Sequence, residues 1–589
     1  MAKKKAKTDK KKQKKIQEFV QSPKSTFVGK VQIAKNSAFL VTEDKTLTGD
    51  ILIPHNKLNG AKNNDKAIVR IIKWPKNSKT PIGEVVDVLG ESGRNDTEMH
   101  AILAEFGLPY TYPQKVEEAA ERISDVMLND ELIGREDFRA VTTFTIDPHD
   151  AKDFDDALSL RKTDSGKWEI GVHIADVTHY VNSDSVIDKE AYKRATSVYL
   201  VDRTVPMLPE RLCNELCSLR PDEEKRCFSV IFEMNNKAEV QFFRICRTII
   251  KSDRRFSYEE AQAVIENGEG DFKDEILTLN DLAQQLRRKR FEKGAIDFDR
   301  YEVKFEIDEK GKPLGVYYKE SKEANKLIEE FMLLANQTVA EFIGNISKGK
   351  RKKTFVYRIH ESPNPDKMEN FAAFVRRLGY KLQTSGSKPE ITKSVNNLLD
   401  KAKGKPESNL IETLAVRSMQ KARYSTENIG HYGLAFSHYT HFTSPIRRYP
   451  DMIVHRLLER YMAGGNSVAE DKYEEKCEHS STMEQLAANA ERASIKYKQV
   501  EFMSDKIGKI YDGIISGVTE WGLYVELNEN KCEGLVPIRD LGDDFYEFDE
   551  KNYCLTGYRR KRIYRLGDPL TVKIMHANLE RRQLDFTLA

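Results

Sequence analysis

Long apolar runs and paired cysteines are both missing from this chain of 589 residues. No stretch of eighteen consecutive apolar residues occurs, which excludes a conventional membrane-spanning helix. The first residues contain no apolar signal core, so we expect a chain that is not secreted. The seven cysteines are odd in number and lack CxxC spacing, which argues against a disulfide framework. These absences predict a protein of the reducing cytoplasm.

An excess of charge of one sign is also missing from most of the chain. Lysine and arginine number 96 against 93 acidic residues, giving a net charge of +3. Residues 1–15 contribute +8, which leaves about −5 for the remainder, so any surface that binds a polyanion must be local. We expect residues 1–23 to form a disordered lysine-rich arm. Such an arm either holds nucleic acid electrostatically or only keeps the chain soluble.

Short alternating segments follow the arm and predict a small closed barrel over residues 24–92. Five candidate strands recur about every ten residues, at 27–34, 37–43, 49–54, 66–74 and 82–90. The stretches Gly29–Val31, Ser37–Val41 and Asp50–Pro54 resemble a cold-shock OB fold. Phe27 and Phe39 could stack on single-stranded bases, or they could fill the barrel.

A large mixed α/β block is predicted after a helical connector at residues 93–140. The block spans residues 141–467, and its segments 168–177 and 227–234 are near-continuous apolar runs, as buried strands should be. Helical periodicity marks 323–345 and 367–378. A charged helical segment at 468–504 completes this unit.

Residues 505–589 return to short strands and resemble the OB-type RNA-binding domain first seen repeated in a ribosomal protein, the S-one domain. Gly513, Trp521–Val525 and Glu533–Val536 carry the resemblance. Trp521 and Tyr524 lie where such folds present aromatic side chains to RNA, and a basic segment, Tyr558–Arg562, follows. The alternative is that both rings pack in the core.

The densest cluster of one residue type is Ile146–Leu158, IDPHDAKDFDDAL, with five aspartates within ten residues. Carboxylates this close repel one another unless a cation neutralises them or some stay protonated. Hard oxygen ligands favour Mg²⁺ or Mn²⁺ over zinc. A calcium loop does not fit, because the required glycine and terminal glutamate are missing at their spacing. A charged turn between two strands is the ordinary alternative.

The same stretch resembles the signature of the RNase II / RNase R exoribonuclease family, whose catalytic unit is the RNB domain. A second block, His431–Leu434 and Thr443–Asp451, resembles that family's second signature about 290 residues later. The resemblance covers roughly residues 24–589. It implies a multidomain α/β (α+β) catalytic core flanked by small all-β OB barrels. It also implies processive 3′→5′ hydrolysis of single-stranded RNA to nucleoside 5′-monophosphates.

The resemblance further implies the site residues. Asp147, Asp153, Asp155 and Asp156 would hold Mg²⁺ or Mn²⁺, with Asp155 central to catalysis. Strand alternation would place Asp153 and Asp155 on one face and Asp156 elsewhere, unless the chain turns there. Arg447 would hold the scissile phosphate, because a guanidinium can grip two phosphate oxygens. Two metal ions about 3.5–4 Å apart would serve the attacking and leaving oxygens.

A clamp for the RNA end is implied in the same way. Tyr199 and Phe298 would sandwich bases, Tyr258 would lie near the terminal ribose, and Glu491 and Arg448 would add RNA contacts. For each residue the alternative is ordinary packing, a salt bridge or a helix-surface charge.

Two features depart from the longer members of the family. In the family that this chain resembles, the longer members have a helix-turn-helix region, two cold-shock barrels and a lysine-rich tail. This chain shows one such barrel and ends at Ala589. The chain is either naturally short or truncated. Within the family, residues 90–110 and 356–368 look most like RNase R.

We expect a monomer that binds single-stranded RNA and no membrane, and association with ribosomes or decay factors does not follow from the sequence. The alternatives are a catalytically silent RNA-binding or chaperone protein and, third, an endonuclease.

Overall fold

The computed structural model describes residues 26–589 except 36, 45, 48, 76–77, 79, 128–132, 297–300, 347–351, 406 and 551. The expected lysine-rich arm and Phe298 therefore lie outside the described residues.

The N-terminal strands close into a five-stranded barrel, which confirms the prediction. The strands are β1 (Thr26–Ala34), β2 (Ser37–Val41), β3 (Ile51–Ile53), β4 (Asp65–Lys73) and β5 (Ile82–Glu91), in the order β1-β2-β3-β5-β4. Alternate residues such as Val31, Leu40 and Ile51 point inward and are buried. Phe27 is buried among them and fills the barrel, so it offers no stacking face, while Phe39 is half-buried.

The connector that follows is less helical than predicted. Helices α2 (Asn95–Glu105) and α3 (Gln114–Glu121) are separated by the Gly107–Pro113 segment. Helix α3 ends at Glu121, and residues 124–127 have no regular secondary structure although their sequence continues the apolar periodicity.

A seven-stranded sheet forms the centre of the α/β block, in the order β14-β7-β8-β9-β12-β13-β6. Its strands are β6 (Glu136–Asp137), β7 (Thr143–Asp147), β8 (Asp156–Lys162), β9 (Trp168–Ala175), β12 (Glu224–Met234), β13 (Val240–Lys251) and β14 (Arg254–Ser257). The central strands β9 and β12 are buried along most of their length, as their apolar runs predict.

Helices and short strand pairs surround this sheet. The helices are α5 (Val177–Tyr180), α6 (Val186–Arg194), the π-helical η3 (Arg211–Leu216), α7 (Tyr258–Asn267), α8 (Lys273–Glu292), α9 (Glu323–Ile346), α10 (Pro365–Arg377), α11 (Lys388–Ala402), α12 (Ser408–Ser418) and α13 (Tyr449–Met462). The pairs are β10 (Val198–Tyr199) with β11 (Thr204–Val205), β15 (Tyr301–Ile307) with β16 (Pro313–Glu320), and β17 (Tyr357–Ile359) with β18 (Arg423–Ser425). Helix α13 packs on the sheet, where its His455 contacts Phe228 of β12.

Helix α14 (Glu470–Ser504) leads from the α/β block to a second closed barrel. This C-terminal barrel consists of β19 (Ile510–Thr519), β20 (Gly522–Leu527), β21 (Glu533–Pro537), β25 (Pro569–Asn578) and β26 (Gln583–Leu588). A separate three-stranded sheet is inserted between β21 and β25, and we call it the outer sheet. It contains β22 (Tyr546–Asp549), β23 (Cys554–Gly557) and β24 (Ile563–Arg565), and it was not predicted.

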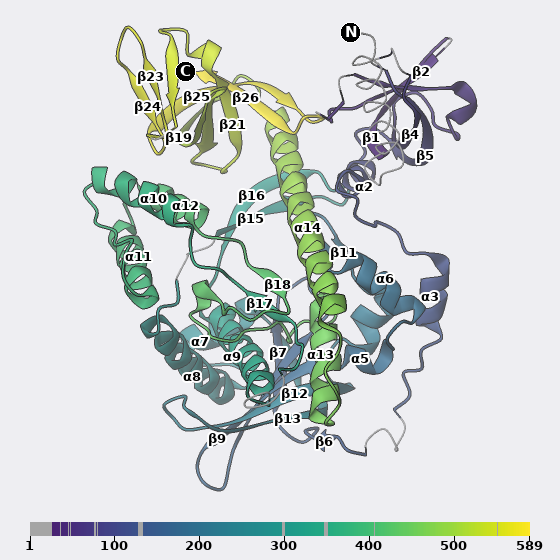
Figure 1. The fold of residues 1–589 in the computed structure, drawn as a ribbon, viewed down its shortest axis with the longest axis vertical. Coiled ribbons are helices and arrows are strands. Elements are labelled where there is room, and N and C mark those ends of the chain that lie inside the picture. Colours follow the sequence, from purple (N-terminus) through teal and green to yellow (C-terminus); the bar gives the residue numbers. More distant parts are fainter. Residues whose placement is uncertain are drawn as a thin grey trace, which may run out of the picture.

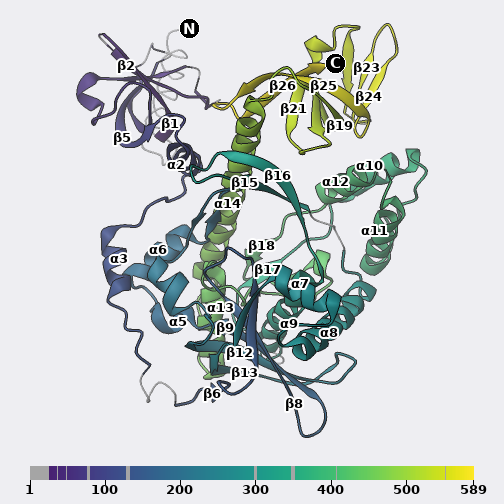
Figure 2. The same cartoon turned by 180° about the vertical axis from the view of Figure 1, so that it is seen from behind.

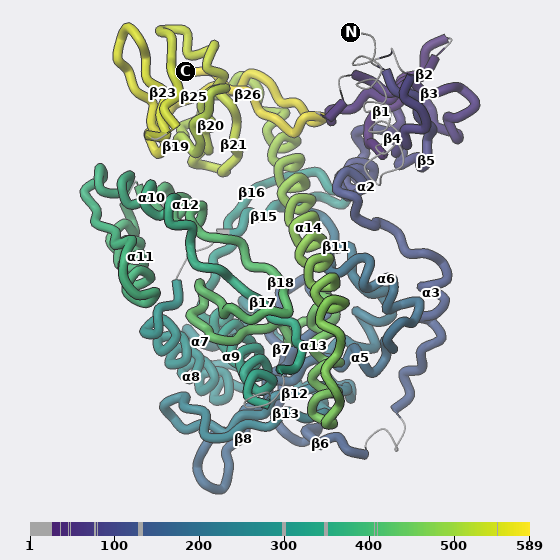
Figure 3. Tube along the Cα trace, viewed as in Figure 1, coloured from purple at the N-terminus to yellow at the C-terminus, as the bar shows by residue number. Residues whose placement is uncertain are grey.

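Both barrels lie at the same end of the α/β block, as the two opposite ribbon views show (Figures 1 and 2). The tube view traces α14 rising from the block to the C-terminal barrel (Figure 3). The turn between β25 and β26 reaches the N-terminal half, where Arg582 pairs with Glu105 and Arg581 with Glu43. Among the residues described, none of the helices has the length and apolar character that crossing a membrane requires.

Candidate active site

The acidic stretch is a loop between two neighbouring strands of the central sheet. Strand β7 ends at Asp147 and β8 begins at Asp156, and the two strands pair through Thr143–Ser159 and Phe144–Leu158. Asp153 and Asp155 therefore precede the strand, and strand alternation does not govern where they point. The chain turns between Asp147 and Asp156, which brings both ends of the loop to one edge of the sheet.

Phe154 explains why this charged loop is ordered. Its ring is buried, its N–H donates to Ser218 Oγ (3.0 Å), and its C=O accepts the N–H of Leu219 (3.0 Å). Arg255 of β14 donates to the carbonyl oxygens of Pro148 and His149, and its guanidinium lies 5.5 Å from the centre of the Phe154 ring. Our reading of the sequence missed Arg255. Arg255 lies beside Thr145 because β14 pairs in parallel with β7, and such a pairing cannot be recognised from a single sequence.

The four predicted carboxylates share an environment that disfavours their charged forms. Burial raises the pKa values of Asp147 and Asp155 well above the usual range, and it also raises that of Asp153. Burial raises the pKa of Asp156 to about 6, against the opposing influence of Arg447 and Arg448. The charge of Asp156 adds to the rise at Asp147. The side chains therefore lie close enough to interact.

The donor atoms of these carboxylates suit a divalent cation. Asp147 Oδ2 is buried without a hydrogen-bond partner, and a cation would satisfy this oxygen. All four offer the hard oxygen ligands that Mg²⁺ and Mn²⁺ prefer. Within the described part of the chain, however, no three His, Cys, Asp or Glu side chains already form a metal-binding group. In the chemistry of its donor atoms, the set of four carboxylates therefore fits such a cation.

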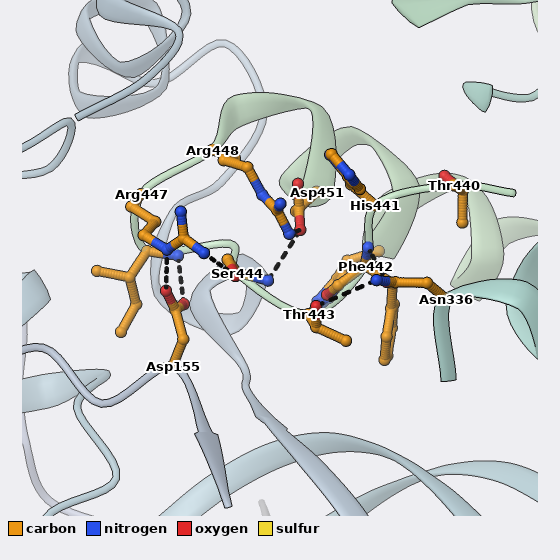
Figure 4. Close-up of polar contacts among 12 residues, drawn as sticks. Asp155, Asn336, Thr440, His441, Phe442, Thr443, Ser444, Arg447, Arg448 and Asp451 are labelled. Carbon is orange, nitrogen blue, oxygen red and sulfur yellow. Dashed lines mark hydrogen bonds and ion pairs between the residues drawn. The ribbon is translucent and has the colours of Figure 1, made fainter. Parts of the chain in front are cut away.

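Asp155 joins the acidic loop to the second signature block (Figure 4). Its buried carboxylate accepts the N–H of Ile446 (2.9 Å) and lies 3.5 Å from Nε of Arg447. The Arg447 side chain is 39% exposed, so part of the guanidinium is free to meet a ligand. Asp155 and Arg447, about 290 residues apart in sequence, thus belong to one candidate active site.

The segment that carries Arg447 is fixed at two points (Figure 4). Arg447 Nη2 donates to Ser444 Oγ (2.9 Å), and the Ser444 N–H donates to the fully buried carboxylate of Asp451 (2.8 Å). Asn336 of α9 accepts the N–H of Phe442 (2.7 Å). Our reading of the sequence missed Ser444, Asp451 and Asn336. Ser444 and Asp451 both belong to the second signature block, but only their contacts in the structure show that they position Arg447.

Two predicted clamp residues lie beside this centre. Tyr199 is 40% exposed. Burial of its hydroxyl raises its pKa to about 12; the charge of Arg447 opposes this rise, and the charge of Asp153 adds to it. Tyr258 begins α7 directly after Ser257, which pairs with Asp147. Burial raises the pKa of Tyr258, and the charges of Asp156 and Asp147 raise it further. Both roles stay predictions.

The other clamp residues are placed less directly. Glu491 lies on α14, where burial raises the pKa of its carboxyl group. Lys304 of β15 opposes this rise and Glu302 of β15 adds to it. Arg448 Nη2 donates to Asp451 (2.8 Å), whereas its buried Nε has no hydrogen-bond partner. Phe298 lies outside the described residues. The RNA contacts proposed for these three stay predictions.

The aromatic pair of the C-terminal barrel differs in exposure. Trp521, at the turn between β19 and β20, is 67% exposed, whereas Tyr524 is half-buried and packs over Gly517. Trp521 offers a free ring face, and Tyr524 offers part of one.

Known protein families match the three regions separately. The RNB domain matches residues 135–464, the cold shock domain 39–113, and the S1 RNA binding domain 504–588. A Ribonuclease R of Aquifex aeolicus is 37% identical over 588 residues, which covers 98% of this chain and 82% of the relative.

Solved structures share the fold. RNase R of Mycoplasma genitalium, in complex with ribose-methylated single-stranded RNA, is 27% identical with a TM-score of 0.88, covering 96% of this chain and 89% of that one. Yeast Ssd1, a pseudonuclease, is 22% identical with a TM-score of 0.71 over 91% and 68% of the two chains, which shows a common fold only. With the RNB domain spanning over half of its length, this chain belongs to the RNB family and is a hydrolytic 3′→5′ exoribonuclease of the Ribonuclease R type.

Proposed function

We propose that the chain degrades single-stranded RNA processively from the 3′ end and releases nucleoside 5′-monophosphates by a two-metal-ion mechanism. The observation that carries this proposal is the pairing of the Asp155 carboxylate with Ile446 and Arg447 beside three further carboxylates. Nucleases of this family are metal-dependent hydrolases.

Asp147, Asp153, Asp155 and Asp156 would hold the ions, which we propose are Mg²⁺ with Mn²⁺ as a substitute. When bound, the ions would supply an activated water and neutralise charge on the attacking and leaving oxygens. The protein positions the carboxylates through the Phe154 anchor and the Arg255 contacts with Pro148 and His149.

Arg447 would bind the scissile phosphate with its exposed guanidinium edge. Its Nη2 is oriented by Ser444 and its Nε by Asp155, so the direction of the remaining N–H groups is set before RNA arrives. A fixed, permanently charged fork stabilises charge that develops in the transition state without reorganising.

The RNA end would lie between Tyr199 and Tyr258, with Phe298, Arg448 and Glu491 adding contacts. Trp521 and Tyr524 of the C-terminal barrel would hold an upstream base. Aromatic faces accept any base, which suits an enzyme that removes nucleotides in succession.

A time course with 5′-labelled single-stranded RNA, with and without Mg²⁺, tests the proposal. We expect Mg²⁺-dependent shortening from the 3′ end with mononucleotide products, and a block by a 3′-phosphate. Products of intermediate length that resist further shortening from a blocked RNA would instead indicate an endonuclease.

A catalytically silent RNA-binding protein is the second candidate. Its two closed barrels, which match the cold shock and S1 RNA binding domains, would bind RNA even if the acidic loop were inactive. It predicts that no mononucleotide is released with either Mg²⁺ or Mn²⁺, at any pH.

Cation binding should stabilise the protein more at neutral than at acidic pH. The native pKa of Asp156 is about 6 and those of its three neighbours are also raised. Since the native state holds these protons more tightly than the unfolded chain, stability is lost as pH rises from about 4 through 6. A bound cation removes this loss. At a concentration about 100 times Kd it adds about 2.7 kcal/mol to the free energy of unfolding.

Thermal melts at pH 5 and pH 7.5, with and without Mg²⁺, measure this effect. Asp156→Asn should raise the melting temperature of the metal-free chain and shrink the Mg²⁺-dependent increase. The matched control is Asp164→Asn, an exposed aspartate in the β8–β9 turn, which should change neither quantity. Equal Mg²⁺ effects at both pH values would contradict the assignment.

Replacing Arg255 by Ala should lower kcat by about 10- to 100-fold, the usual cost of losing a residue that orients metal ligands. The loop bearing Asp147–Asp155 would lose its carbonyl contacts, while the RNA-binding barrels would be untouched. Single-turnover rates and RNA affinity measure the two effects. Arg254→Ala is the control on the same strand, because Arg254 pairs with Glu260 and Asp271 instead. A similar loss in both variants would mean that strand β14, and not the loop contact, is responsible.

A further inference from the structure

The outer sheet is an addition that the C-terminal barrel does not need for closure. The five barrel strands form a closed order without it, and β22–β24 pair only among themselves. The sheet is nevertheless firmly packed. Leu555 and Tyr564 are buried in the core shared with the barrel, and Phe374 of α10 contacts Tyr553 beside the sheet.

One end of this sheet presents two large aromatic rings to solvent. The register of β22 and β23 ends at the pair Tyr546–Gly557, so Phe545 and Tyr558 come next and lie opposite each other. The Tyr558 N–H donates to the Phe545 carbonyl (2.7 Å), which extends the pairing by one step. Directly opposite residues project from the same face of a sheet. The two rings are 75% and 73% exposed, so neither has a packing role.

Four consecutive cations follow Tyr558 in the chain, and two of them lie beside the rings. Arg559 lies 5.9 Å from the centre of the Phe545 ring, and Lys561 lies 5.6 Å from that of Tyr558. Arg560 and Arg562 both lie near Asp543, at 3.7 and 3.6 Å, but their side chains remain 67% and 54% exposed. The patch is positive although residues 16–589 together carry about −5.

Two aspartates fix the geometry of this patch. Asp544 accepts the N–H groups of Arg559, Arg560 and Phe545, and Asp543 accepts the hydroxyl of Tyr546. The turn with the cations is thereby held against the segment that carries Phe545. A merely solubilising surface needs neither two exposed aromatic rings on one face nor a backbone held in place beside the cations.

We propose that Phe545 and Tyr558 form a stacking platform for unpaired bases of RNA, with Arg559, Arg560 and Arg562 on the flanking phosphates. Ring faces bind bases that are not stacked in a duplex, so the ligand is single-stranded RNA. The platform is distinct from Trp521 and Tyr524, which belong to the barrel. In Figure 1, where β7 of the central sheet is lower in the view, the outer sheet (β23 and β24) that carries this platform lies on the side of the C-terminal barrel away from the N-terminal barrel. It therefore holds RNA that has not yet reached the catalytic centre, an inference that rests on the proposed function for its substrate.

The test compares RNA affinity in the full chain without divalent cations, so that no hydrolysis occurs. The probes are a short oligoadenylate, sufficient for the catalytic centre alone, and a long one that also reaches the outer sheet. In F545A/Y558A we expect the long RNA to bind about 10- to 100-fold more weakly, from the loss of base stacking. The short RNA should bind as before, and F545W/Y558W should restore affinity.

Three further comparisons complete the experiment. Phe242→Ala removes another exposed aromatic ring (57%), on β13 of the central sheet, and should leave the affinity unchanged. R559Q/R560Q/R562Q should reduce the salt slope of log Kd by about 2, at roughly 0.7 per phosphate contact on single strands. A blunt duplex of the same length should not respond to F545A/Y558A.

Unchanged affinity for the long RNA in F545A/Y558A would overturn the proposal and point to a protein partner for the patch. An equal loss for short and long RNA would overturn the upstream placement. Binding is measured without turnover, so it does not depend on the proposed activity. If F545A/Y558A lost affinity for the long RNA while the unmodified chain hydrolysed no RNA, the proposed function would be refuted and the platform would stand.

Discussion

Replacing Asp155 by Asn should reduce the rate of RNA hydrolysis by about 10³-fold or more and leave RNA affinity nearly unchanged. Asp155 belongs to the acidic loop and contacts the second signature block through the Ile446 N–H and Arg447. An amide retains the size but not the charge needed to hold a divalent cation. Losing the charge stabilisation that a cation supplies costs several kcal/mol, and about 4 kcal/mol corresponds to 10³ in rate.

Single-turnover cleavage of 5′-labelled RNA measures the rate, and binding without divalent cations measures the affinity. Asp150→Asn is the matched control, since Asp150 lies in the same loop but is exposed and outside the proposed ligand set. We expect wild-type rates from that variant. Substantial turnover by Asp155→Asn would remove Asp155 from the catalytic role, and a parallel loss in Asp150→Asn would indicate general disruption of the loop.

The sequence was sufficient to predict the two chemical halves of the site but not what holds them in place. Asp155 and Arg447 stand in dense, distinctive blocks, so their chemistry is legible without a structure. Arg255 acts on backbone carbonyls of Pro148 and His149, and any residue type would offer the same carbonyls. No pattern of side chains can reveal such a contact.

The fold shows the same division. The N-terminal barrel was predictable because its strands alternate regularly and recur at short intervals. The outer sheet was not predictable, because β22–β24 have three or four residues each, and Tyr553, just before β23, packs on Phe374, which is distant in sequence. The basic segment Tyr558–Arg562 was noticed. Its pairing with Phe545 depends on a strand register that only the structure supplies.

Replacing Arg447 by Lys should lower kcat by about 10²- to 10³-fold, the range for losing one oriented donor to a developing charge. Lysine keeps the positive charge but has no planar fork, so it cannot contact Ser444, Asp155 and a phosphate in fixed directions. Single-turnover rates at saturating RNA measure the loss. Arg456→Lys is a matched control, because Arg456 of α13 pairs with the buried Asp188 of α6 and its replacement should affect stability alone.

The pH dependence separates the charge of Arg447 from its geometry. Its positive charge lowers the pKa values of Asp153, Asp155 and Asp156 against the effect of burial. Arg447→Gln should therefore raise those pKa values, and the acidic limb of the pH–rate profile should move to higher pH because the carboxylates must ionise to bind a cation. Arg447→Lys should lose rate without this displacement. If both variants displaced the acidic limb equally, the geometry of the guanidinium would have no separate role, and Arg447 would act on the aspartates by charge alone.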